Sequence, residues 1–128
     1  MQVEIKADER LDDLELKGLK IIQDPSKFCF GIDAVLLSAF AKVKPGEDVV
    51  DIGTGTGIIP LLLSAKTDAK YIKAVEIQPD MADMAKRSVL YNSLQDRIEI
   101  ICNDIKRADS FIKKSSVDVV VSNPPYIK

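Results

Sequence analysis

The sequence predicts an α/β protein with a mostly parallel sheet. From residue 48 onward, short β-branched runs alternate with longer helical patterns, as in successive βαβ units. The first of these runs leads into a glycine-rich turn at residues 51–57, which is typical of a loop where backbone closely approaches a ligand. A chain of 128 residues is large enough for one such domain.

Composition narrows the class of protein. Hydrophobic residues make up 46% of the chain and charged residues 30%, which indicates a globular domain rather than a disordered one. The net charge of −2 argues against a broad basic face that would bind nucleic acid.

No apolar run approaches the roughly 20 residues of a membrane span, and the polar start is unlike a signal peptide, so we expect a cytoplasmic protein. With no histidine and two widely spaced cysteines, we expect no metal site.

The elements after residue 47 follow from local patterns. Pro60 fits the first turn of a helix over residues 56–66, and Pro79 opens a second helix with apolar residues at helical spacing. A weak third helix begins near Arg107 or Ala108. The predicted strands are residues 48–52, 71–76, 97–101 and 117–121.

The first 47 residues form a separate part of the same domain. A β-hairpin is predicted between residues 14 and 22 with Gly18 at its turn. Asp33 is expected to cap a helix over residues 34–42 that buries Leu36 and Leu37. Residues 1–47 are therefore interpreted as an N-terminal hairpin and capping helix, and residues 48–128 as a ligand-binding core.

The glycine-rich turn differs from the dinucleotide fingerprint. Its glycines are Gly53, Gly55 and Gly57, whereas the third glycine of that fingerprint would fall at position 58, which is Ile58. A compact Gly-x-Gly-x-Gly after an acidic residue, here Asp51, resembles motif I of the S-adenosylmethionine-dependent methyltransferases. Side chains at the three glycines would block the approach of such a ligand.

Acidic residues end three successive predicted strands, at the edge where α/β sheets bind ligands. Asp51 is suited to the cationic amino-acid end of S-adenosylmethionine, and Glu76 to its ribose hydroxyls. Asp104 is placed to accept a hydrogen bond from the adenine amino group, and the Ile105 N–H to donate one to the ring. Taken singly, each acid is equally well explained as a solvated residue at a strand end.

The last six residues carry a second motif. Asn123, Pro124, Pro125 and Tyr126 resemble motif IV of the amino-methyltransferases. Consecutive prolines hold the residue before them in an extended conformation. The Asn123 amide oxygen and the Pro124 carbonyl could then accept hydrogen bonds from an acceptor NH₂ group, and Tyr126 could stack on a flat ring. This chemistry needs no general base.

Residues 8–14, 21–23 and 28–37 resemble the start of the bacterial tRNA(Val) adenine-N6 methyltransferases. The resemblance implies a Rossmann-like class I methyltransferase fold, S-adenosylmethionine as cofactor and tRNA as substrate. It also implies that the loop from Phe30 to Asp33 closes over the methionine end of the donor. In this family the strand order is 3-2-1-4-5-7-6, so the four strands here would be the 3-2-1-4 half of the sheet, with the C-terminal half absent.

Several alternatives stay open. A protein-glutamine methyltransferase acting on release factors uses the same Asn-Pro-Pro-Tyr motif, and a guanine-N2 rRNA methyltransferase is a third possibility. A fourth is an inactive donor-binding fragment. The fourth strand would be an open edge in a half sheet, so we expect it to be covered by further chain, by a second copy or by a crystal neighbour.

Overall fold

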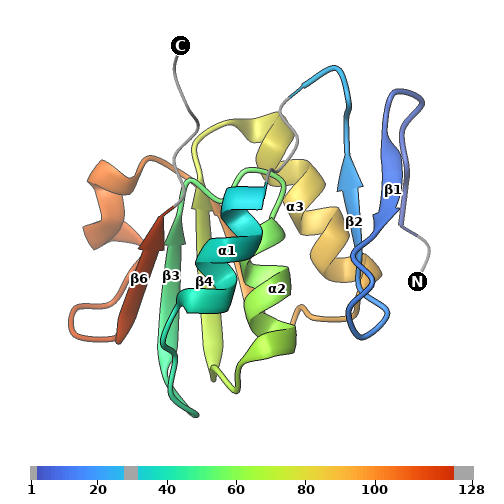
Figure 1. The fold of residues 1–128 in the computed structure, drawn as a ribbon. Helices are drawn as coiled ribbons and strands as arrows, with labels where there is room; N and C mark the ends of the chain where they lie inside the picture. The colour runs from blue at the N-terminus through green and yellow to red at the C-terminus, as the bar shows by residue number, and fades with distance from the viewer. Residues whose placement is uncertain (1–2, 28–31, 123–128) are drawn as a thin grey trace.

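A four-stranded parallel sheet brings the carboxyl ends of its strands to one edge of the molecule (Figure 1). The computed structural model describes residues 3–27 and 32–122. The strand order is β5-β4-β3-β6, which confirms the predicted 3-2-1-4 arrangement. The strands are β3 (Asp48–Ile52), β4 (Tyr71–Glu76), β5 (Ile98–Cys102) and β6 (Val119–Ser122).

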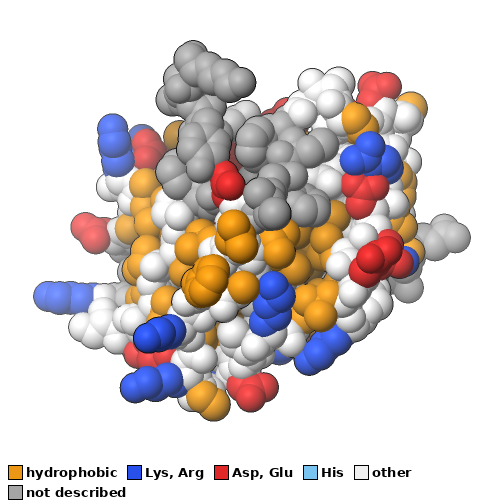
Figure 2. Space-filling model, in the orientation of Figure 1, with side chains coloured by type: hydrophobic (Ala, Val, Ile, Leu, Met, Phe, Trp, Pro, Cys, Tyr) orange, Lys and Arg blue, Asp and Glu red, His pale blue; other side chains and the backbone are white. Residues whose placement is uncertain are grey.

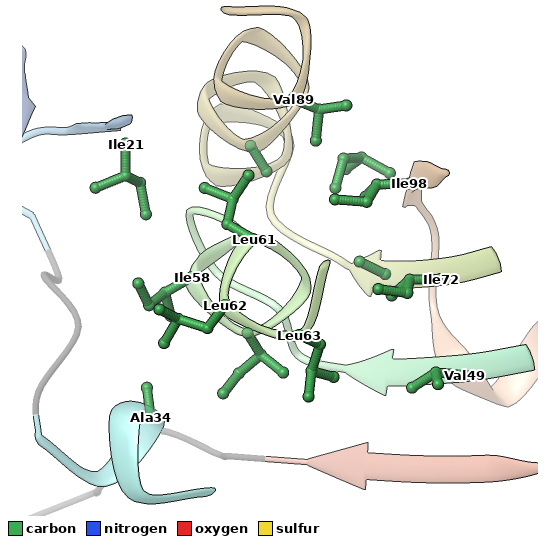
Figure 3. Close-up of a cluster of buried hydrophobic side chains, with 14 of the residues drawn as sticks. Ile21, Ala34, Val49, Ile58, Leu61, Leu62, Leu63, Ile72, Val89 and Ile98 are labelled. Atoms are coloured by element: carbon green, nitrogen blue, oxygen red, sulfur yellow. The ribbon is translucent and has the colours of Figure 1, made fainter. Parts of the chain in front are cut away.

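Helix α2 (Ile58–Lys66) lies at the centre of the core. Seven of its nine residues are buried, as expected of a helix that is apolar on every side. In Figure 3 its side chains point outward in several directions: Leu63 lies toward Val49 of β3, and Ile58 lies between Ile21 and Ala34. The sheet, the hairpin and two further helices therefore share one hydrophobic core.

Arg97, just before β5, closes the C-terminal end of α2. Its guanidinium donates to the backbone carbonyls of Ser64 at 2.9 Å and Ala69 at 2.9 Å, and to that of Thr67 at 3.4 Å. Carbonyls at a helix C-terminus lack partners within the helix, and a cation there also complements the helix dipole. This side chain thus joins α2 to the amino end of the sheet.

Helix α1 differs from its prediction in position and burial. It spans Ile32–Phe40, so Asp33 lies inside its first turn instead of capping it from outside. Leu37 is half-buried, but Leu36 is 48% exposed and Phe40 is 77% exposed, so the expectation that both leucines enter the core is wrong for Leu36. Figure 2 shows the resulting group of hydrophobic side chains on the face where α1 lies. The helix packs on α2, and the side that carries Leu36 and Phe40 is exposed.

The N-terminal hairpin pairs β1 (Arg10–Asp13) with β2 (Lys20–Gln23). A hairpin is confirmed, but residues 14–19 form its connection rather than its strands. Helix α3 (Pro79–Tyr91) holds the free edge of β2 through side chains. The Ser88 hydroxyl accepts the Ile22 N–H at 2.8 Å, and the Asn92 amide bonds both the N–H and the carbonyl of Lys20. These bonds supply the partners that a further strand would supply.

The predicted weak helix is a 3₁₀ helix, η1 (Ile105–Ser110), which begins two or three residues earlier than expected. The reason is Asp104, whose carboxylate accepts the Lys106 N–H at 2.9 Å and caps the helix start. Within the described ranges, no helix is both long and apolar enough to cross a membrane.

Candidate functional site

The glycine-rich turn is anchored to the end of β4. The N–H groups of Gly53 and Thr54 both donate to the Val75 carbonyl, at 2.8 and 3.0 Å. Gly53, Gly55 and Gly57 all have positive φ, at 72°, 60° and 95°. Such angles strain residues that carry a side chain, which explains why glycine occupies these positions.

The glycines of the turn differ in what a side chain at each position would meet. A Cβ atom at Gly53 would meet nothing within 4 Å, so that position is open to a ligand. A Cβ atom at Gly57 would lie 3.2 Å from Cβ of Ala85 on α3. Gly57 therefore allows α3 to pack against the start of α2, a role in packing that the sequence interpretation did not include.

Glu76, at the end of β4, connects this turn to the loop that follows. Its side chain is 6% exposed. One carboxylate oxygen accepts the Gly55 N–H at 2.8 Å, and the other accepts the Gln78 N–H at 3.0 Å. A carboxylate has about four acceptor positions, so each oxygen retains capacity for one further donor. The side chain is thus held in place while it can still accept hydrogen bonds from a ligand.

A cavity of about 140 Å³ lies at the carboxyl edge, beside Glu76. Four predicted site residues line it: Gly53, Glu76, Asp104 and Ile105. Its other lining residues are Ile52, Val75, Ile77 and Asn103. The sequence interpretation missed Ile77, which is 60% exposed despite its size. A large apolar residue directly after a strand-end acid is the signal that could have identified it.

Asp51 lies on β3 beneath the turn and is fully buried. Neither of its carboxylate oxygens has a hydrogen-bond partner, and the nearby Thr54 hydroxyl is also buried without one. Burial raises the pKa of Asp51 to about 7, an effect that the Thr54 hydroxyl opposes and the Glu76 carboxylate reinforces. A buried acceptor without a partner is costly, and Asp51 lies beneath the turn without lining the cavity itself.

The remaining predicted site residues lie apart from this cavity or cannot be placed. Asp33 is in the first turn of α1, outside the cavity lining. Lys27, which precedes the predicted donor loop, forms an ion pair with Asp80 on α3 at 2.8 Å. Phe30, Asn123, Pro124 and Tyr126 lie outside the described residues.

The described chain ends at Ser122, directly before the second motif. Ser122 pairs with Ile52 in the register of β3 and β6, and its hydroxyl donates to the Ile52 carbonyl at 3.3 Å. Ile52 also lines the cavity. The strand that leads into the Asn-Pro-Pro-Tyr motif therefore ends next to the wall of the cavity.

Residues 19–128 match the family model of the methyltransferase small domain. The chain belongs to the methyltransferase small domain family. The motif I resemblance is thereby confirmed at the level of the family, on a sheet with the expected strand order.

Curated proteins resemble the chain over most of its length. A protein named tRNA1(Val) (adenine(37)-N6)-methyltransferase from Phocaeicola vulgatus is 39% identical over 110 residues, which are 86% of this chain and 45% of that protein. A protein of the same name from Bacteroides thetaiotaomicron is 37% identical over 114 residues, covering 88% and 46%. This methyltransferase small domain chain spans less than half the length of either relative.

Solved structures confirm the Rossmann-like methyltransferase fold class. M. jannaschii TYW2 in complex with AdoMet superposes with a TM-score of 0.71 at 18% identity, over 94% of this chain and 53% of that one. TrmN from Thermus thermophilus superposes with a TM-score of 0.60 at 26% identity, over 72% and 27%. The first likeness supports the fold alone, because its sequence identity is low.

The buried Asp51 predicts a stability that falls with rising pH. Its pKa is near 7 in the folded protein and near 4 in the unfolded chain, so the folded state keeps a proton that the unfolded state loses between these values. Folding is thus penalised above pH 7 and not below pH 4. We expect Asp51→Asn to raise the free energy of unfolding at pH 8 by up to about 4 kcal/mol, with little gain at pH 4.

Urea unfolding followed by circular dichroism at both pH values measures this difference. Asp68→Asn, at an exposed loop position, is the matched control and should change the unfolding free energy by less than about 0.5 kcal/mol at either pH. An Asp51→Asn effect that is the same at pH 4 and pH 8 would contradict the assignment.

Proposed function

We propose that this protein is an S-adenosylmethionine-dependent methyltransferase of the cytoplasm that methylates N6 of an adenine in tRNA. The observation that carries the proposal is the cavity at the carboxyl edge of the sheet. Residues from the ends of three neighbouring strands line it, and two of them, Glu76 and Asp104, are carboxylates. Ligands of parallel α/β sheets bind at this edge.

The described residues fit the chemistry of S-adenosylmethionine part by part. Its ammonium group would supply the partner that the buried Asp51 carboxylate lacks. The ribose hydroxyls would donate to the free lone pairs of Glu76. Asp104 would accept from the adenine amino group while the Ile105 N–H donates to the ring. Ile77 offers an apolar surface for the base beside these polar groups.

The acceptor would be held by the motif that follows β6. An exocyclic amine is a weak nucleophile because its lone pair is delocalised into the ring. Hydrogen bonds from the NH₂ group to the Asn123 amide oxygen and the Pro124 carbonyl would help the nitrogen become tetrahedral and direct its lone pair at the donor methyl group. Tyr126 would stack on the base. The proton leaves after transfer and needs no histidine.

The relatives' name supports tRNA adenine as the substrate. Both are named for N6 methylation of adenine 37 in a valine tRNA. The chain matches less than half of their length, so substrate recognition by the whole enzyme is part of the proposal. Methylation of a protein glutamine or of guanine N2 in rRNA would use the same planar NH₂ chemistry, and both are outcomes that the substrate assay below distinguishes.

We further propose that another protein segment pairs with β6. This strand pairs with β3 on one side and forms the edge of the described sheet on the other. Val120 on β6 is 60% exposed. Parallel sheets are normally covered on both faces, and an exposed apolar edge strand favours pairing with further chain.

Donor binding is the first test. Calorimetry with S-adenosylhomocysteine should show about 10- to 100-fold weaker binding to Glu76→Gln, because the amide replaces an acceptor with a donor. An analogue lacking the ribose 2′-hydroxyl should bind less tightly than S-adenosylhomocysteine to the wild type and no less tightly to the variant. Glu99→Gln, at an exposed position on the neighbouring strand, is the control and should bind normally. Equal affinities for wild type and Glu76→Gln would refute the ribose contact.

Methyl transfer is the second test. The protein is incubated with labelled S-adenosylmethionine and total tRNA, rRNA or release factor, and we expect label in N6-methyladenosine of tRNA. Asn123→Ala should lower the turnover rate by roughly 100-fold, the effect of losing one hydrogen bond that orients the reacting group. Ser122→Ala, one residue earlier, should retain activity. Label in protein or guanine alone, or normal turnover by Asn123→Ala, would overturn the proposal.

The edge of β6 is the third test. Size-exclusion chromatography of the 14.1 kDa chain should show association that grows with concentration, and Val120→Lys should weaken it by placing a charge on the edge. Ile5→Lys, an exposed apolar position in the N-terminal segment, should not. A stable monomer at every concentration would contradict the proposed pairing.

A further inference from the structure

One segment of this acidic chain is locally basic. Residues 105–117 carry Lys106, Arg107, Lys113 and Lys114 against a single acid, Asp109, in a chain with a net charge of −2. All four basic side chains are exposed. We call residues 105–117, which carry these four cations, the basic segment.

The fold holds the basic segment in a defined orientation. Its apolar residues Ile105, Phe111 and Ile112 are half-buried, so the cationic positions alternate with anchored ones. After η1, the Lys113 carbonyl accepts the Ser116 N–H at 3.2 Å, which closes a tight turn at the lysine pair. The cations are therefore displayed from a fixed backbone, with less ordering to lose on binding than a disordered tail would have.

The basic segment begins at the donor cavity and leads away from it. Ile105, the first residue of η1, lines the cavity, and Lys106 and Arg107 follow directly. A second hollow of about 630 Å³ lies between η1 and the next turn and is lined by Ala108, Ile112, Lys113 and Lys114 among others. In Figures 1 and 2, η1 and the loop before β6 form one border of the molecule, along which Lys and Arg side chains project together with some Asp and Glu side chains.

These cations are not used within the protein. In residues 3–27 and 32–122, every ion pair joins side chains from the first 27 residues or from α3, such as Arg87 with Glu9. None of the four cationic side chains of the basic segment has an ion-pair partner among the residues that the structure describes. The four cations are therefore available to an external anion; what sets them apart from other lysines without an ion pair in the described part of the chain, such as Lys42 and Lys44, is that their segment begins at the donor cavity.

We propose that the basic segment contacts the phosphate backbone of the RNA substrate on the side of the active site where adenine of the donor would bind. The inference rests on the proposed function and adds the surface that holds the RNA. A polyanion with regularly spaced phosphates matches a row of unpaired cations on a fixed backbone. Such contacts position RNA without reading its sequence, so the choice of adenine remains with the Asn-Pro-Pro-Tyr motif.

The test compares charge changes at two places. Lys113→Glu/Lys114→Glu removes two phosphate contacts from the basic segment, and Lys42→Glu/Lys44→Glu makes the same charge change at exposed lysines after α1. Filter binding to tRNA is measured from 50 to 300 mM salt. We expect about 10- to 100-fold weaker binding at 100 mM salt for the first pair only, and a salt slope about 1.5 smaller, since each contact contributes roughly 0.7–0.9.

Two further measurements separate binding from folding. Lys113→Gln/Lys114→Gln removes the contacts without adding repulsion and should lose part of the same affinity. Every variant should bind S-adenosylhomocysteine as the wild type does. The proposed RNA-binding surface would be refuted if both lysine pairs lost tRNA affinity equally, or if neither lost any, while the wild type still bound tRNA. Either result would leave the proposed function intact. A wild type that binds donor and methylates release factor but not tRNA would overturn the RNA substrate and this surface together.

Discussion

Parallel pairing of four strands is the constraint on which the candidate site depends. Because β3, β4, β5 and β6 run in the same direction, Asp51, Glu76, Asp104 and the end of β6 reach one edge although up to 71 positions separate them in the chain. Backbone hydrogen bonds between strands set this arrangement. The Glu76 carboxylate then holds the glycine turn against the loop after β4, because it accepts backbone N–H groups from both.

The two ends of the sheet differ in how their polar groups are hydrogen-bonded. At the amino end, Arg97 joins α2 to the start of β5 through three carbonyl groups, and Asp118 bonds the backbone of Asp48. At the carboxyl end, the turns leave open space beside Gly53 and buried oxygens on Asp51 without partners. These polar groups at the amino end therefore have hydrogen-bond partners within the protein, whereas the Asp51 oxygens, toward the end where we expect a ligand, have none.

Much of this arrangement can be predicted from the sequence because it depends on local signals. The β-branched runs predicted strands 48–52 and 71–76 with correct bounds. Asp51, Glu76 and Asp104, at or just beyond the ends of three strands, identified the edge where the cavity lies. Contacts between distant residues could not be predicted in this way. No local pattern shows that Gly57 faces Ala85, that α3 replaces a strand beside β2, or that Leu36 is exposed, since each depends on how separate elements pack.

The contact between Gly57 and Ala85 affects how variation in the glycine motif is interpreted. Gly53 borders the cavity, so a side chain there would act on a ligand, whereas a side chain at Gly57 would separate two helices. A larger residue at position 57 would therefore act first on the packing of α3 against the start of α2. Glycine at these two positions thus has two different physical reasons, open space beside the cavity at Gly53 and close helix packing at Gly57.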